Sequence, residues 1–166
     1  NRNINVNING KNSNVLINIS SISLNENNYD VSIHHNNKNC TSNTNIHGLT
    51  IDNNSIYIKN NGYIPNGSEK SVLHQDNKII VMNDNKSKIE PNLFIDEYDV
   101  EASHGAYIGK FDEEELFYLN SRGLDENKCY ELLINGFLLN EFNITDDVKD
   151  DLKKIIKKYW RWKNEL

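Results

Sequence analysis

Residues 3–9 read Asn-Ile-Asn-Val-Asn-Ile-Asn, a strict alternation that puts three apolar side chains on one face and asparagines on the other. A period of two is typical of a β-strand with one buried face. Short apolar runs of the same kind recur as far as residue 95, and turn residues such as Asn9-Gly10 bound them. The first hundred residues are therefore predicted to form many short strands.

Two architectures accommodate such strands: a sandwich or barrel, and a solenoid of stacked parallel rungs. Of the 31 asparagines in the chain, 25 fall within residues 1–100. Stacked asparagine side chains can hydrogen-bond along a ladder, and asparagine tolerates the left-handed backbone found at rung corners. The asparagines therefore favour a parallel β-helix, although no fixed sequence repeat is visible.

The composition changes near residues 100–112, and from Asp112 the apolar period becomes helical. Asp112, Asp125 and Thr145 are predicted to cap three helices, and Gly123 to end the first. The inner face of the second helix is assigned to Leu132, Leu133, Phe137 and Leu138. We predict a mainly β fold, with a β-helix over residues 1–105 and a small helical domain over residues 106–166.

The charge and hydropathy exclude two classes of partner. The net charge is −6 and the pI is near 5.3. An acidic chain lacks the basic surface that supplies affinity for nucleic acid. No apolar run approaches the ~20 residues of a membrane span. Cys40 and Cys129 are far apart in sequence, which predicts no disulfide framework and favours a reducing compartment.

Motifs for the common catalytic chemistries are absent from the sequence. Gly105-Ala-Tyr-Ile-Gly109-Lys110 is one residue short of a phosphate loop, and Phe111 replaces its hydroxyl residue. There is no Gly-x-Ser-x-Gly elbow and no His-Glu-x-x-His pair. His34, His35, Cys40 and His47 match no metal-ligand spacing, so we interpret them as structural.

Five segments follow one another in a recognisable order: Gln-Asp-Asn-Lys-Ile-Ile-Val at 75–81, Ile-Glu-Pro-Asn-Leu-Phe-Ile-Asp-Glu-Tyr-Asp-Val at 89–100, Ala-Ser-His-Gly-Ala at 102–106, Phe-Tyr-Leu-Asn-Ser-Arg-Gly-Leu at 117–124 and Asn-Gly-Phe at 135–137. Together these segments closely resemble the carboxy-terminal part of the SufB/SufD family, the scaffold proteins of the SUF system of iron–sulfur cluster assembly. The Ser-His-Gly-Ala and Ser-Arg-Gly spellings are similar to SufD, whereas SufB typically carries Glu-His-Glu-Ala and Gln-Arg-Gly.

The resemblance implies a right-handed parallel β-helix followed by a helical domain, with further rungs and an amino-terminal domain upstream of residue 1. It also implies a non-catalytic scaffold that pairs with SufB through the β-helix and binds the SufC ATPase through its carboxy-terminal helices. We assign that docking surface to Phe117, Tyr118, Arg122 and Phe137. Because the β-helix would be open at its first rung, we also expect self-association.

The resemblance further implies that His104 lies at the SufB–SufD interface and helps to build a transient iron–sulfur cluster, with Glu101 as a second candidate. Many relatives carry cysteine where this chain has Ala102. Two distant cysteines cannot supply a four-cysteine site, so a cluster would be shared with SufB, and no cofactor is expected to stay bound. Imidazole is a competent iron ligand.

Two other function classes are compatible with a β-helix. One class is a carbohydrate-active β-helix enzyme, which needs paired carboxylates, whereas residues 1–100 hold only ten scattered acids. The other is a purely structural solenoid, which would need neither the helical tail nor the histidine motif.

The asparagine excess indicates an A/T-rich genome, so we expect a plastid or apicoplast stroma rather than a bacterial cytoplasm, with the targeting segment upstream of residue 1.

Overall fold

The structure is a computed structural model that describes residues 1–51, 53–82 and 86–164. Within these residues, eight strands form the first unit of the chain, Asn1–Gly109. The strands are β1 (Arg2–Ile8), β2 (Asn14–Ser23), β3 (Glu26–His35), β4 (Thr41–Thr50), β5 (Ser55–Ile64), β6 (Val72–Val81), β7 (Lys88–Ile95) and β8 (Glu101–Gly109). Strand β8 therefore runs four residues beyond the boundary expected at 105/106.

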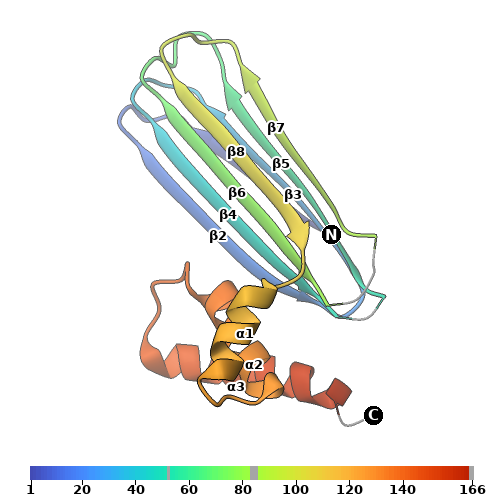
Figure 1. Cartoon of the computed structure of the whole chain (residues 1–166). Helices are drawn as coiled ribbons and strands as arrows, with labels where there is room; N and C mark the ends of the chain where they lie inside the picture. Colours follow the sequence, from blue (N-terminus) through green and yellow to red (C-terminus); the bar gives the residue numbers. More distant parts are fainter. Residues whose placement is uncertain (52, 83–85, 165–166) are drawn as a thin grey trace. The chain divides into compact units, whose positions relative to one another are not determined.

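The strands form two parallel sheets, in the orders β1-β3-β5-β7 and β2-β4-β6-β8. Ile4 pairs in register with Val31, and Val31 with Asn60, so successive rungs are 27 and then 29 residues apart. Each turn of the chain adds one strand to each sheet, which gives a β-solenoid of about four turns (Figure 1). The predicted β-helix is confirmed, and the sandwich or barrel is excluded because every strand pair is parallel.

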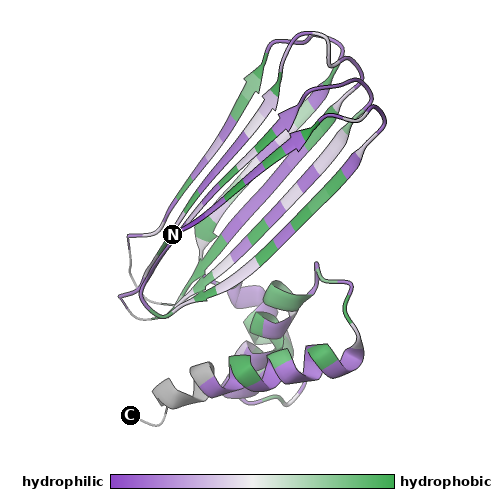
Figure 2. Cartoon of the chain, turned by 180° about the vertical axis from the view of Figure 1, so that it is seen from behind, coloured by the Kyte–Doolittle hydropathy of each residue, from purple (hydrophilic) through white to green (hydrophobic). Residues whose placement is uncertain are grey.

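The core of the solenoid lies between the two sheets. Val31, Ile33 and Ile58 are among its fully buried side chains, whereas the residues between them along the strands are only partly buried. Figure 2 shows the resulting alternation of apolar and polar residues along the strands. Full burial of one such aliphatic side chain contributes roughly 1.5–3 kcal/mol, so the repeated columns of Ile and Val supply most of the stabilisation.

Left-handed residues recur at one corner of the solenoid. Asn12, Asn39 and Lys70 have φ angles of 58°, 56° and 58°. The amide of Asn12 donates to Lys38 O at 3.2 Å, and the amide of Asn39 donates to Glu69 O at 3.0 Å, which stacks each corner on the next. Asparagine is enriched in this conformation, so the expectation that asparagine serves the corners is confirmed for two of three positions.

Lys70→Asn should stabilise the solenoid by about 0.5–1 kcal/mol, because a left-handed backbone costs a lysine about 1–2 kcal/mol and costs asparagine less. Lys70 is exposed, so the change removes no packing. Urea unfolding measures the difference. Lys11→Asn is the matched control, because Lys11 is an exposed turn residue without a positive φ, and it should leave stability unchanged. A destabilised Lys70→Asn chain would contradict the argument.

His35 makes the folding stability depend on pH. The side chain is fully buried, its Nε2 lies 2.7 Å from Ser42 Oγ, and burial lowers its pKa below the ordinary value of 6.5. As the pH falls below 6.5, the unfolded chain takes up a proton that the folded chain refuses, so stability is lost. The free energy of unfolding should therefore be lower at about pH 5.5 than at about pH 7.5. This difference between the two pH values should be smaller in His35→Gln. An identical pH dependence in both proteins would contradict this role.

The described residues of the second unit, Lys110–Leu166, form three helices: α1 (Glu113–Ser121), α2 (Glu126–Leu139) and α3 (Asp146–Asn164). The predicted caps are confirmed for the first two, because Asp112 accepts from the amide of Glu114 and Asp125 from that of Lys128, each at 2.8 Å. Gly123 follows α1 with a φ of 88°. No described helix is long and apolar enough to cross a membrane.

The buried face of α2 differs from the expected one at Leu132. The buried residues are Cys129, Ile134, Leu138 and Leu139, whereas Leu132 is 42% exposed. Leu132 lies two positions from Ile134, about 200° around the helix, and cannot share its face. The assignment of Leu132 to the inner face was wrong, because several adjacent apolar residues leave the helix orientation ambiguous in the sequence.

Candidate functional site

His104 lies on β8, the last strand of its sheet. In the part of the chain that the structure describes, β8 pairs with β6 alone, and Ser103–Ile108 are all exposed. His104 is in register with Gln75, which is buried, so the two residues belong to an inward-facing column. His104 therefore stands over the interior of the solenoid at its open end, accessible because no further strand covers it among the described residues.

Two side chains of β6 hydrogen-bond to β8 on either side of His104, one to the side chain of Ser103 and one to the backbone of Gly105. On the outer face, His74 Nδ1 lies 2.7 Å from Ser103 Oγ. On the inner face, Asn77 Nδ2 donates to Gly105 O at 3.1 Å. The strand is thus anchored immediately before and after an exposed imidazole. A functional side chain on an anchored strand is held in place better than one on a loop.

Glu101 lies on the other face of β8 from His104. Successive side chains of a strand alternate between faces, so residues three apart point to opposite sides. Glu101 is exposed, and its Oε1 lies 3.6 Å from His74 Nε2. The structure therefore brings Glu101 to His74 and does not bring it to His104.

Gly105 leaves space on the outer face of β8. A Cβ built at this position would lie 3.5 Å from Asp76 Oδ1 and 3.8 Å from Gln75 O, both ordinary contact distances. The chain itself therefore does not require glycine here.

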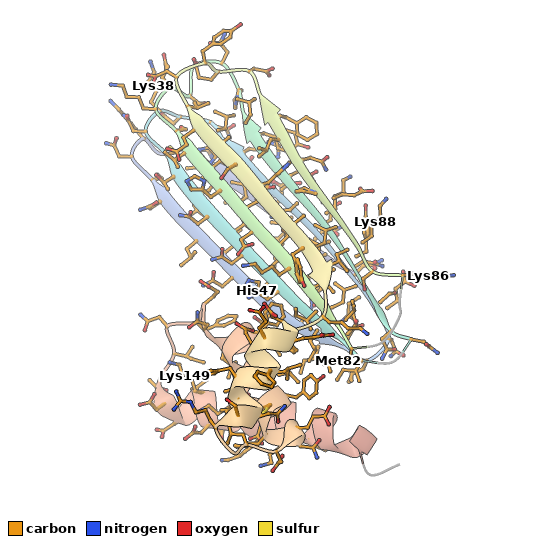
Figure 3. The ribbon with its side chains drawn as sticks, viewed as in Figure 1. Lys38, His47, Met82, Lys86, Lys88 and Lys149 are labelled. Carbon is orange, nitrogen blue, oxygen red and sulfur yellow. The ribbon has the colours of Figure 1, made fainter. Side chains whose placement is uncertain are left out.

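The remaining histidines and cysteines are dispersed. His34 stacks on Tyr63 with ring centroids 4.2 Å apart, whereas His35 points into the core. His47 Nε2 lies 3.9 Å from Asp76 Oδ2, and Figure 3 shows His47 together with the other side chains. Cys40 and Cys129 are both buried and free. Within the described residues, no group of three or more His, Cys, Asp or Glu side chains could hold a metal ion.

The residues assigned to ATPase docking lie on α1, at its C-cap Arg122 and on α2. Phe117 is 75% and Tyr118 is 56% exposed, and the Arg122 guanidinium lies 5.1 Å from the Tyr118 ring centroid. Phe137 is only partly exposed and packs edge-on against Phe111, with centroids 6.1 Å apart. A groove of about 380 Å³ lies beside Tyr118; it is lined by Asp112, Glu114, Glu115, Tyr118, Leu119 and Leu133. The groove itself is lined by apolar and acidic residues, and Arg122 beside Tyr118 adds a positive charge to the docking surface.

Sequence reasoning missed His74, Gln75 and Asn77, the β6 residues that surround His104. The alternation within β6 contained a usable signal: polar residues stand at positions 75 and 77, where an inward column would normally be apolar. Their relation to His104 depends on the register between β6 and β8, which no local pattern specifies.

A sequence model of the family described as "SUF system FeS cluster assembly, SufBD core domain" matches residues 1–137. The chain belongs to this family. The resemblance to SufB/SufD is thereby confirmed, and SufBD proteins act in iron–sulfur cluster assembly. The match covers the whole solenoid and extends into α2.

Individual relatives support the likeness to SufD. The iron–sulfur cluster assembly protein SufD of Bacillus subtilis is 34% identical over 116 residues, which are 68% of this chain and 26% of that protein. A SufBD family protein of Pyrococcus horikoshii is 39% identical over 101 residues, 58% of this chain and 22% of that protein. Escherichia coli SufD is 36% identical over 62 residues, 37% of this chain and 14% of that protein. The chain thus spans about a quarter or less of the curated SufBD relatives it matches.

Proposed function

We propose that this SufBD chain is part of a SufD-like scaffold subunit that contributes His104 to a cluster-assembly site shared with a SufB-like partner. The observation that carries the proposal is the position of His104: an exposed imidazole on a terminal strand whose two neighbouring residues, Ser103 and Gly105, are hydrogen-bonded to β6 side chains. Family membership favours such a scaffold over a carbohydrate-active enzyme or a purely structural solenoid.

The open edge of β8 supports pairing with the SufB-like subunit. A terminal strand presents a row of backbone donors and acceptors that another chain can extend. Tyr107 and Ile108 on β8 and Phe94 on β7 are large, exposed and apolar, which adds contact area beside that edge. Glu101 and Gly105, on the outer face of β8, belong to the interface in this proposal.

A nascent iron–sulfur cluster is the cargo of this site. Neutral imidazole is a competent iron ligand, and it needs one ring nitrogen without a proton. Ala102, the neighbouring residue in the inward column, offers no ligand atom. The other ligands therefore come from the partner chain in this proposal, and the chain itself is not an enzyme.

The helical unit supplies the second proposed contact, with a SufC-like ATPase. Phe117 and Tyr118 on α1, with Arg122 at its C-cap, present an exposed aromatic and cationic cluster. Aromatic residues and arginine are the types that dominate the binding energy of protein interfaces. Phe137 supports the cluster from α2 through its packing on Phe111.

The proposed location is a plastid or apicoplast stroma, and it rests on composition alone. The asparagine excess supports an A/T-rich genome. Imaging of the tagged full-length protein tests it, and a signal outside any plastid would reject it in favour of the alternative, a bacterial cytoplasm.

Co-purification followed by anaerobic reconstitution tests the proposed function. The chain, within its full-length protein, should co-purify with SufB and SufC homologues, and the complex should build a cluster when given iron, sulfide and a reductant. Iron content and visible absorbance report the yield. Failure to form the complex, or equal cluster yield on the partners without this subunit, would contradict the proposal.

A further inference from the structure

The interior beneath His104 is polar, and Gln75 lies at its centre. Gln75 is only 4% exposed and is in register with Thr44 on one side and His104 on the other. Its Nε2 donates to Asn60 O at 3.3 Å and to Asn92 O at 3.4 Å, across the core to β5 and β7. Both partners are carbonyl oxygens, which only accept hydrogen bonds, so the orientation of the Gln75 amide is fixed.

The opposite end of this amide is unpaired. Gln75 Oε1 is buried and has no hydrogen-bond partner among the described residues. A buried acceptor without a donor is destabilising, and most buried polar atoms in proteins have a partner. The next residue along the same inward column is His104, whose ring carries an N–H donor in every protonation state.

We propose that Gln75 is a positioning residue for His104: the two side chains are not bonded in this structure, and a turn of the exposed imidazole toward the interior lets Gln75 Oε1 accept a hydrogen bond from one ring N–H of His104. This inference rests on the proposed function, because it concerns how the same histidine is presented. A ring nitrogen that donates to Gln75 keeps its proton, so the other nitrogen carries the lone pair. Hydrogen bonds of this kind fix the tautomer and ring orientation of histidines that bind metals. The site then offers iron a neutral imidazole in one orientation.

Asn60 offers a competing buried acceptor, and its position on β5 excludes it. Asn60 Oδ1 is also buried without a partner among the described residues. Asn60, however, lies on β5 in register with Val31 and Pro91, in the sheet that does not contain His104. Its amide nitrogen donates to Asn77 Oδ1 at 2.9 Å. Gln75 is therefore the acceptor that shares a column with His104.

Nitrogen-15 NMR of the His104 ring in the full 166-residue chain tests the proposal. Wild-type His104 should populate one tautomer predominantly. Gln75→Met keeps a side chain of similar length without the acceptor, and it should shift the tautomer ratio by about fivefold, as expected from the loss of one hydrogen bond. Thr44→Val is the matched control, because Thr44 is buried in the same column one rung farther away, and it should leave the ratio unchanged.

If Gln75→Met fails to fold, the wild-type spectrum alone still tests the hydrogen bond between His104 and Gln75. A hydrogen-bonded ring N–H should be protected from exchange and should show contacts to the Gln75 side chain. A tautomer ratio equal to that of free histidine, or one unchanged in Gln75→Met, would overturn the proposal.

The spectroscopic result is independent of cluster assembly. If the tautomer responds to Gln75→Met but His104→Ala builds clusters normally, the proposed function fails and the positioning inference stands. If His104→Ala is inactive and the tautomer ratio of His104 is unchanged in Gln75→Met, the proposed function stands and the positioning inference fails.

Discussion

His104→Ala should abolish cluster build-up on the complex of this SufBD subunit with its SufB-like and SufC-like partners. The variant removes the only side-chain nitrogen that the inward column of β8 presents at the open end of the solenoid. The side chain is exposed, so its removal should lower the free energy of unfolding by only about 0.5–1.5 kcal/mol, the net contribution of its proposed hydrogen bond to Gln75. Loss of function should therefore come without loss of fold or of partner binding.

Anaerobic reconstitution of the complex with each variant, followed by iron counting and visible absorbance, measures this effect. The matched control combines Cys40→Ser with Cys129→Ala, because both thiols are buried and neither lies on β8. The control should keep most of the cluster yield. Normal yield with His104→Ala, or complete loss with the double cysteine variant, would refute the assignment.

The strands that could be predicted from sequence are those whose inward positions are apolar. β1 alternates Ile and Val with Asn, and the structure places the apolar side in the core. β4, by contrast, buries Ser42 and Thr44 at inward positions, so most of it carries no apolar alternation. Ser42 is accepted in the core because it hydrogen-bonds to buried His35, an interaction that only the fold creates.

In the candidate site, too, features set by residues close in sequence could be predicted, whereas features set by strand pairing could not. Helix caps such as Asp112 act within three residues and could be predicted from spacing alone. The face on which His104 lies depends on pairing with Gln75, 29 residues earlier, and on the absence of a further covering strand in the described chain. The motif could identify His104, but the separation of Glu101 from it required the register.

Phe117→Ala combined with Tyr118→Ala should weaken binding of the SufC-like ATPase by about 100-fold or more. Truncation of a central aromatic residue at an interface typically costs 2 kcal/mol or more, and every 1.4 kcal/mol is tenfold in affinity. Both rings are more than half exposed, so the helical unit should keep its fold. Removal of Tyr118 also releases Arg122, whose guanidinium lies over that ring.

Two comparisons separate loss of this surface from general damage to the helices. Val148→Ala with Ile155→Ala is the matched control, because both residues are exposed apolar residues on α3, outside the proposed surface, and their truncation should leave affinity within about threefold. A chain ending at Gly109 removes the whole helical unit and should abolish ATPase binding while the solenoid still folds, since the two units are each compact. Titration calorimetry with the purified ATPase gives the affinities. Undiminished binding by the chain that ends at Gly109 would move the ATPase contact from the helices to the solenoid.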